Sequence, residues 1–232
     1  MLKLRTDIVY VGPDGKLTQA GIEAIQGQLD GQASSSSAGL TALTATVTAI
    51  DGRVTALETG ARVRLATRTA SASASLNFTE FNNTLYRRYE FELDSLLPAT
   101  DNTTFWLRTS TNGGSTYDAG ATDYAYTGTE KGSGAEVDSV DSLGAPQIVL
   151  CTSVGNAAGE QGVSGIVSVW GAGVAARTTF RTFLHSFDAA DGSPFIVNGA
   201  AARLASQDTD AVRFLFSSGN ITSGTIRMYG IV

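Results

Sequence analysis

The chain has 232 residues, which is enough for one sizeable domain with smaller appendages. Only 16% of the residues are charged, against about 25% in an average globular protein. The formal net charge of −6 disfavours a general affinity for nucleic acid or for an anionic membrane. No apolar run is long enough for a membrane span, and the first residues lack a signal-peptide core. We therefore expect a protein that is made in the cytoplasm and does not insert into membranes.

The chain contains one cysteine and one histidine, which excludes an intrachain disulfide and the common zinc sites within one chain. Cys151 lies in an apolar run, which indicates a buried, unreactive thiol. His185 lies between Phe183 and Phe187 on the same face of a predicted strand, which indicates a packed or rim position rather than a catalytic one. We expect no catalytic residue, no metal site and no cofactor.

Residues 1–30 are predicted to form a small docking unit. A short strand near the start is followed by a Pro-Asp-Gly turn and by a helix with Ile22, Ile25 and Leu29 on one face. These apolar groups are too few for independent folding, so we expect the unit to dock on a larger partner. Residues 31–39 are rich in Ser, Gly and Ala, and this composition predicts a flexible linker.

Residues 40–59 are predicted to form a trimeric coiled coil. Their apolar residues are spaced alternately by three and four, which gives a narrow heptad stripe rather than the wider face of an isolated surface helix. The pattern from Arg53 to Glu58 resembles the trimer signature of short coiled coils, in which an Arg stem covers the seam and its head reaches a neighbouring Glu. The residues assigned to trimerisation are Leu40, Leu43, Val47, Ile50, Arg53, Val54, Leu57 and Glu58.

Two considerations limit this coil. Gly52 and several Thr residues are modest helix formers, and six buried aliphatic side chains do not offset the backbone entropy of ordering the segment. The β-region that follows should therefore contribute to the same oligomer. The alternative is a single surface helix that packs on its own domain.

From residue 61 the apolar pattern changes to a period of two. Alternation is clear at 89–93, 105–108, 212–216 and 226–229, and further strand candidates lie at 62–69, 73–78, 147–152, 163–170 and 177–183. About ten short strands separated by turn signals predict an antiparallel β-sandwich over 61–232, of jelly-roll type. The predicted fold is thus mainly β, preceded by the short trimeric coiled coil and the small N-terminal docking segment.

The segment 110–146 is too long for a simple hairpin connection, and such loops tend to be functional or disordered. It interleaves tyrosines, whose rings can stack on a sugar, with carboxylates that can accept hydrogen bonds from vicinal hydroxyls. We therefore predict a glycan-binding site there. The alternative is that Tyr124 and Tyr126 belong to a strand and pack in the core. The predicted glycan-binding residues are Tyr117, Asp118, Asp123, Tyr124 and Tyr126.

The β-region resembles the C-terminal domains of fibre and spike proteins of tailed phages and of phage-like gene transfer agents. The similar stretches are 89–93, the run 107–117 (LRTSTNGGSTY) and the ending 218–230 (SGNITSGTIRMYG). The resemblance implies a homotrimer on the surface of a virion-like particle, a head spike or tail fibre, whose β-domains contact host-surface glycans. It identifies no ligand residues.

Three functions follow from this interpretation. In the first, residues 1–30 attach to a capsid or tail protein and the β-domains bind host polysaccharide during adsorption. In the second, the chain is a structural connector that carries a further distal adhesin. The third is a glycan-depolymerising tailspike, which would need paired carboxylates such as Asp118 with Asp123 or Glu136 with Asp138. We rank it last, because glycine-rich loops have no hydrophobic pocket to raise an acid's pKa.

Overall fold

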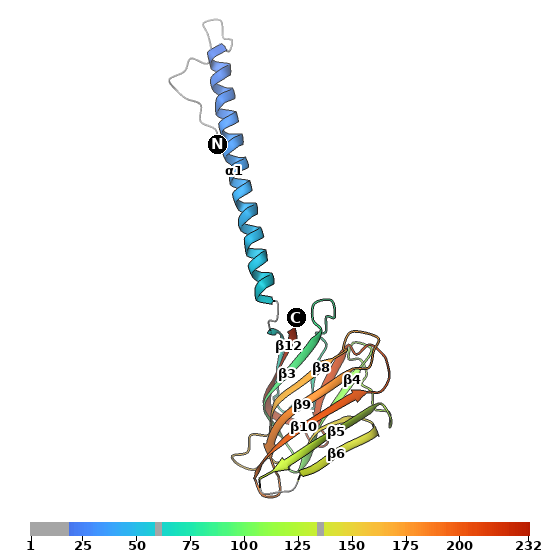
Figure 1. Cartoon of the computed structure of the whole chain (residues 1–232). Coiled ribbons are helices and arrows are strands. Elements are labelled where there is room, and N and C mark those ends of the chain that lie inside the picture. The colour runs from blue at the N-terminus through green and yellow to red at the C-terminus, as the bar shows by residue number, and fades with distance from the viewer. Residues whose placement is uncertain (1–18, 59–61, 134–136) are drawn as a thin grey trace. The chain divides into compact units, whose positions relative to one another are not determined.

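The computed structural model describes residues 19–58, 62–133 and 137–232, without the side chains of 48–58 and of Val137. The chain divides into two compact units at Leu57. One contains the helix α1 (Gln19–Glu58), and the other is the β-domain (Figure 1). Of the N-terminal docking unit predicted at 1–30, residues 1–18 lie outside the described residues.

α1 is one continuous helix of 40 residues, about 60 Å long at 1.5 Å per residue. The prediction of a flexible linker at 31–39 is therefore wrong. Lengthening an existing helix needs no new nucleation, and Ala and Gln are good helix formers. The hydroxyls of this stretch also bond locally, since Ser35 Oγ donates to the Gln32 carbonyl at 3.0 Å and Thr41 Oγ1 to the Ser37 carbonyl at 2.9 Å.

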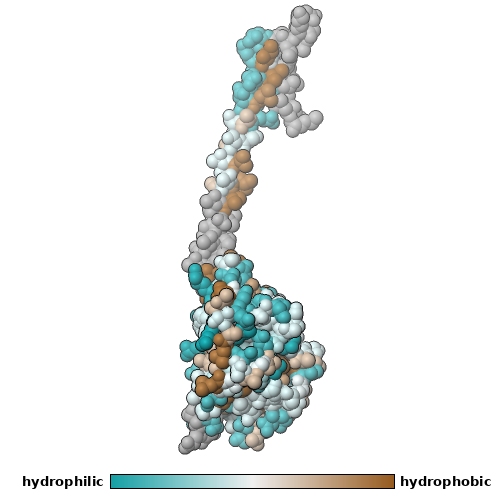
Figure 2. Space-filling model, turned by 90° about the vertical axis from the view of Figure 1, so that its right-hand side faces the viewer, coloured by the Kyte–Doolittle hydropathy of each residue, from teal (hydrophilic) through white to brown (hydrophobic). Residues whose placement is uncertain are grey.

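Most large apolar residues of α1 share one heptad register, with Ile25 at a flanking g position. Ile22, Leu29 and Leu43 are separated by multiples of seven residues, so the predicted docking helix and the predicted coil lie in phase on one rod. Figure 2 shows hydrophobic groups gathered on one side of the helix. Leu40 and Leu43 are 66% and 60% exposed within the chain. The side chains of Ile50, Arg53, Val54, Leu57 and Glu58 lie outside the described residues.

The β-domain is built from two antiparallel sheets, as predicted. The eight-stranded sheet has the order β1 (Arg62–Thr69), β12 (Ile221–Ile231), β3 (Arg88–Pro98), β8 (Val163–Trp170), β9 (Thr179–Phe187), β10 (Pro194–Arg203), β5 (Tyr124–Gly132) and β6 (Val137–Ala145). The four-stranded sheet has the order β2 (Leu76–Phe78), β11 (Ala211–Phe216), β4 (Thr103–Ser110) and β7 (Ile148–Val154). Their buried faces share one hydrophobic core, which makes the domain a β-sandwich.

Eight of the strands form two matched layers, β1-β12-β3-β8 and β2-β11-β4-β7. Successive strands of this frame alternate between the layers except at β4 and β7, which pair within one layer, and this arrangement is consistent with a jelly roll. Two hairpins, β5–β6 and β9–β10, are inserted into this frame and widen the larger sheet (Figure 1).

Most strand predictions are confirmed, and the differences lie in these hairpins. The segment 110–146 contains β5 and β6, so the alternative that placed Tyr124 and Tyr126 in a strand is the observed one. The strand β10 was not predicted, because its Gly-Ala-Ala-Ala run lacks β-branched and aromatic residues. It is a strand because it pairs along its length with β9 and β5.

The core is organised around the aromatic ring of Phe214 on β11. Its ring centroid lies 5.2 Å from that of Phe91 on β3 in the opposite sheet, and 6.1 Å and 6.0 Å from those of Phe78 and Phe105. All four residues have no exposed surface. The pairs with Phe91 and Phe78 are edge-to-face and the pair with Phe105 is stacked, and such aromatic pairs add about 0.5–1.5 kcal/mol each beyond the burial of their area.

One prediction of packing is wrong. On β9 the inward positions are those of Phe180, Thr182 and Leu184, so the alternate positions face solvent. Phe183 is 60% exposed and His185 is exposed beside it. The two inward-facing apolar side chains determine which side of the strand meets the core, since the side-chain period of a strand is two.

Cys151 on β7 is fully buried, as predicted, and burial raises the pKa of its thiol well above the ordinary value of 9.0. The neutral thiol is favoured in the folded state, so its contribution to stability is complete below pH 9 and is lost as the pH rises. Between pH 9 and 10, the unfolding free energy of the wild type should fall by about 1 kcal/mol more than that of Cys151→Ala. Urea denaturation at both pH values measures the difference. Parallel pH profiles would contradict it.

Candidate functional site

The predicted glycan-binding residues lie where the chain leaves β4, loops over one end of the sandwich and enters β5. The loop is tied back to the sheet, because the Asp118 amide donates a hydrogen bond to the Thr109 carbonyl at 2.9 Å. Thr109 is fully buried at the end of β4. The loop is therefore part of the packed structure on this side.

Tyr124 is completely buried and cannot stack on a sugar. Its hydroxyl accepts a hydrogen bond from the Thr109 amide at 2.8 Å and donates one to the Asp118 carbonyl at 3.2 Å. Burial raises the pKa of its phenol, although the bonds with Thr109 oppose that shift. Tyr124 fastens the loop to the core, and its assignment to a ligand is wrong.

Asp118 is engaged by Arg203, the last residue of β10. Asp118 Oδ2 accepts a hydrogen bond from Nε of Arg203 at 2.8 Å and lies 2.8 Å from Nη2 in an ion pair, and the Arg203 side chain is only 5% exposed. The same guanidinium donates to Gln207 Oε1 at 2.7 Å and to the Ala205 carbonyl at 3.3 Å. Burial of a charged group requires such partners. The contacts of this carboxylate are those of a structural ion pair.

Asp123 closes the turn before β5. Its Oδ2 accepts a hydrogen bond from the Gly120 amide at 2.6 Å, and its carbonyl accepts one from the Leu204 amide at 2.8 Å. This is the local side-chain to backbone bonding that makes Asp a frequent turn residue.

Tyr117 is half-buried under Arg213, whose guanidinium carbon lies 3.9 Å from the centre of its ring. Burial raises the pKa of Tyr117, and the nearby positive charge of Arg213 opposes the shift. The buried Tyr117 hydroxyl and the buried Oδ1 of Asp210 have no hydrogen-bond partner within the described part of the chain. Of the five predicted residues, Tyr117 is thus the one whose polar atom remains unsatisfied.

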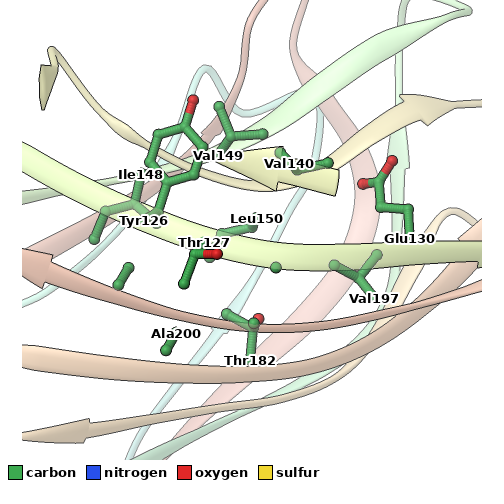
Figure 3. Close-up of a pocket in the computed structure, with 13 residues that line it drawn as sticks. Tyr126, Thr127, Glu130, Val140, Ile148, Val149, Leu150, Thr182, Val197 and Ala200 are labelled. Carbon is green, nitrogen blue, oxygen red and sulfur yellow. The ribbon is translucent and has the colours of Figure 1, made fainter. Parts of the chain in front are cut away.

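Tyr126 lines a small internal cavity between β5, β10 and β7 (Figure 3). The cavity volume is about 10 Å³, which is room for one water molecule and excludes a sugar ring. It exists because Gly128 and Gly199 face each other across the two strands and leave no side chains to fill the space. At its other end in Figure 3, Glu130 accepts hydrogen bonds from the amide and the hydroxyl of Thr152.

The five residues therefore do not form one open site. Asp118, Tyr124 and Thr109 form a connected network, Asp123 holds a turn, and Tyr117 and Tyr126 pack elsewhere. Two accessible hollows lie instead on the outer side of the large sheet, and a third, of about 590 Å³, lies between the loops at 157–160 and 189–192. One of about 350 Å³ has an alanine-rich floor and Leu143 at its margin, and one of about 280 Å³ is bounded by His185 and Ile196. Phe183 lies between these two hollows and is exposed. From the sequence alone, its aromatic ring was expected to pack in the core, so this part of the surface was missed.

Within the described ranges, no three His, Cys, Asp or Glu side chains come together as a metal site would require. The one helix among those residues is not long and apolar enough to cross a membrane. Comparisons with models of known protein families, with curated protein sequences and with solved structures found no match.

The Arg203–Asp118 pair predicts a stability phenotype. Asp118→Ala leaves the buried guanidinium without its carboxylate and should lower the free energy of unfolding by about 3 kcal/mol. This is the lower end of the range for a broken buried pair, because the Asp118 side chain is 26% exposed. Arg203→Met should cost less, since it removes the buried charge itself. Asp123→Ala serves as the control, with a loss of about 1 kcal/mol for one turn hydrogen bond. Chemical denaturation measures the stability of all three variants. If Asp118→Ala unfolds at the same denaturant concentration as the wild type, the carboxylate is not a structural partner and is better assigned to a ligand.

Proposed function

We propose that the chain is a trimeric fibre or spike protein on the surface of a virion-like particle, and that it binds host-surface polysaccharide. One observation carries the proposal: α1 is a 40-residue helix with a heptad stripe, and the described apolar residues of that stripe are exposed within the chain, namely Ile22, Leu29, Leu40, Leu43 and Val47. An amphipathic stripe of this width is typical of a coiled-coil seam. A second and a third copy of the same helix are partners of matching length, register and chemistry.

Several features favour three strands. Ile22 and Ile50 occupy d positions, and β-branched residues at d shift coiled coils away from dimers. The pattern from Arg53 to Glu58 supports the same stoichiometry. Because the helix is continuous through 31–39, the seam is about twice as long as the sequence predicted. Gln26 and Ser36 interrupt it with polar groups that can set the register of the coil.

In this proposal residues 1–30 attach the trimer to a capsid or tail protein, and the jelly-roll-like β-domains contact the glycan. Three identical heads on one rod raise a weak single-site affinity through multivalency, which suits a repetitive polysaccharide. A binding rather than a catalytic role is supported by the carboxylates of the loop. Asp118 is held by Arg203 and Asp123 by a turn amide, so neither is poised as a general acid. Glu136 lies outside the described residues.

The alternative is the structural connector, in which the β-domain carries a further distal adhesin. The exposed apolar side chains on the outer side of the large sheet favour it as the second candidate, because a contiguous exposed apolar patch marks an interaction surface. The two candidates share the trimeric rod and differ in what the β-domains contact.

The coiled coil is tested by the mass of the full chain in solution. Multi-angle light scattering should report three times the chain mass of 24.1 kDa. Leu43→Asp with Val47→Asp places two charges in each seam and should dissociate the trimer, because buried unpaired charges are costly. Ala45→Asp, on the opposite side of the helix, is the matched control and should leave the mass unchanged. A wild-type chain that runs as a monomer would reject the proposal.

Ligand binding is tested separately by retention of the full-length trimer on an array of immobilised bacterial surface polysaccharides. An adhesin should be retained selectively on some of the glycans. Because of avidity, the trimer should bind at least tenfold more strongly than the Leu43→Asp/Val47→Asp monomer. Release of oligosaccharides from the array would identify a depolymerase. A trimer that is retained by no glycan would favour the connector.

A further inference from the structure

The outer side of the eight-stranded sheet has two halves that differ in charge. On β1, β12 and β3 the outward side chains form a self-compensating ladder. Arg62 contacts Glu90 at 3.0 Å and Glu92 at 2.7 Å, and Arg227 contacts Glu92 and Asp94 at 3.3 Å. These charges already have partners within the chain, so this half is a solvated surface.

The other half consists of the outward sides of β8, β9, β10, β5 and β6, which we term the charge-poor face (Figure 1). Among the described residues, its outward strand positions carry only three charged side chains, those of Arg181, Lys131 and Asp141. The remaining positions hold Ser, Thr, Asn, Ala and one His, together with exposed apolar residues. The depletion of charge and the exposed aromatic ring are features of interface cores, whereas the Ser and Ala residues of this face are less common there.

The apolar residues of this face are neighbours across strands. Ile166 on β8 lies directly opposite Phe183 on β9, and Ile196 on β10 lies opposite His185, one diagonal step from Phe183. The exposed fractions of Ile166, Phe183 and Ile196 are 39%, 60% and 49%. The alanine-floored hollow with the 94% exposed Leu143 continues the surface across β10 and β5.

The size of the face also matches a protein interface. Five strands with about four outward positions each present roughly twenty side chains, and a stable interface uses about 20–30 residues on each side. A saccharide ligand would need only a small part of this area. Low charge favours contact with a second copy of the same face, since no strong like-charge repulsion opposes the approach.

We infer that the charge-poor face is where the β-domains of neighbouring copies meet. The inference rests on the proposed trimer and names the surface by which the β-domain contributes to it. Burial of the seam's aliphatic side chains does not offset the entropy of ordering its own helix, so a stable oligomer needs a second interface. Three such faces turned toward a common axis bury Phe183 and Ile196 against neighbouring copies and leave the charged ladder in solvent.

The test introduces Phe183→Asp with Ile196→Asp into the full chain. Both side chains are about half exposed within one chain, so the fold should be retained, and circular dichroism checks this. The matched control, Thr67→Asp with Thr69→Asp, adds the same charge to exposed positions of β1 on the charged half of the sheet. Light scattering over a dilution series measures the concentration at which each trimer dissociates.

We expect the Phe183/Ile196 variant to dissociate at a concentration at least tenfold higher than the wild type and the control. Dissociation at the control's concentration would overturn the inference while leaving the proposed trimer intact. A variant that stays trimeric but loses retention on the polysaccharide array would also overturn it, and would identify the face as the ligand site. A monomeric wild type would overturn both proposals.

Discussion

The β-domain depends on the contact between Phe214 and Phe91, which joins its two sheets at a ring distance of 5.2 Å. Neither sheet can bury its apolar side without the other, and the rings of Phe78 and Phe105 complete the same cluster. Once these residues face inward, the strict alternation of strands directs every second side chain to the outside. The exposure of Phe183 is a consequence of this constraint, because the inward places on β9 are already taken by its neighbours.

The inserted hairpins form most of the surface that we propose as the interface between copies. β5–β6 and β9–β10 widen one sheet to eight strands, while its partner remains four strands wide. The inner side of the extension is closed over β7 with a cavity of only about 10 Å³. Its outer side carries few charges and several exposed apolar groups. The extension is thus wide enough to meet another protein copy, whereas the charged half beside it is satisfied by its own ion pairs.

The helix adds a second constraint on function. A single register from Ile22 to Leu57 makes the proposed seam one continuous helix through 31–39. In the proposed trimer the seam would select the partners and their register, and the β-domains would add the area that the seam lacks. The two interfaces would then be coupled, because forming one of them holds the chains together and reduces the entropy cost of forming the other.

The sequence by itself determined the local patterns: the heptad spacing of Leu40 to Leu57, the alternation that defines most strands, and the burial of Cys151, because each depends on a short-range period. Only the tertiary structure decided the rest. β10 became a strand through pairing rather than propensity. The helix through 31–39, by contrast, follows from local propagation between helical neighbours, and the Ser- and Gly-rich composition alone did not indicate it. The roles of Asp118 and Tyr124 were decided by Arg203 and Thr109, partners 85 and 15 residues away in the chain. A polar side chain offered to a ligand and one that satisfies a buried partner look the same in sequence, because the difference lies in what the fold places beside it.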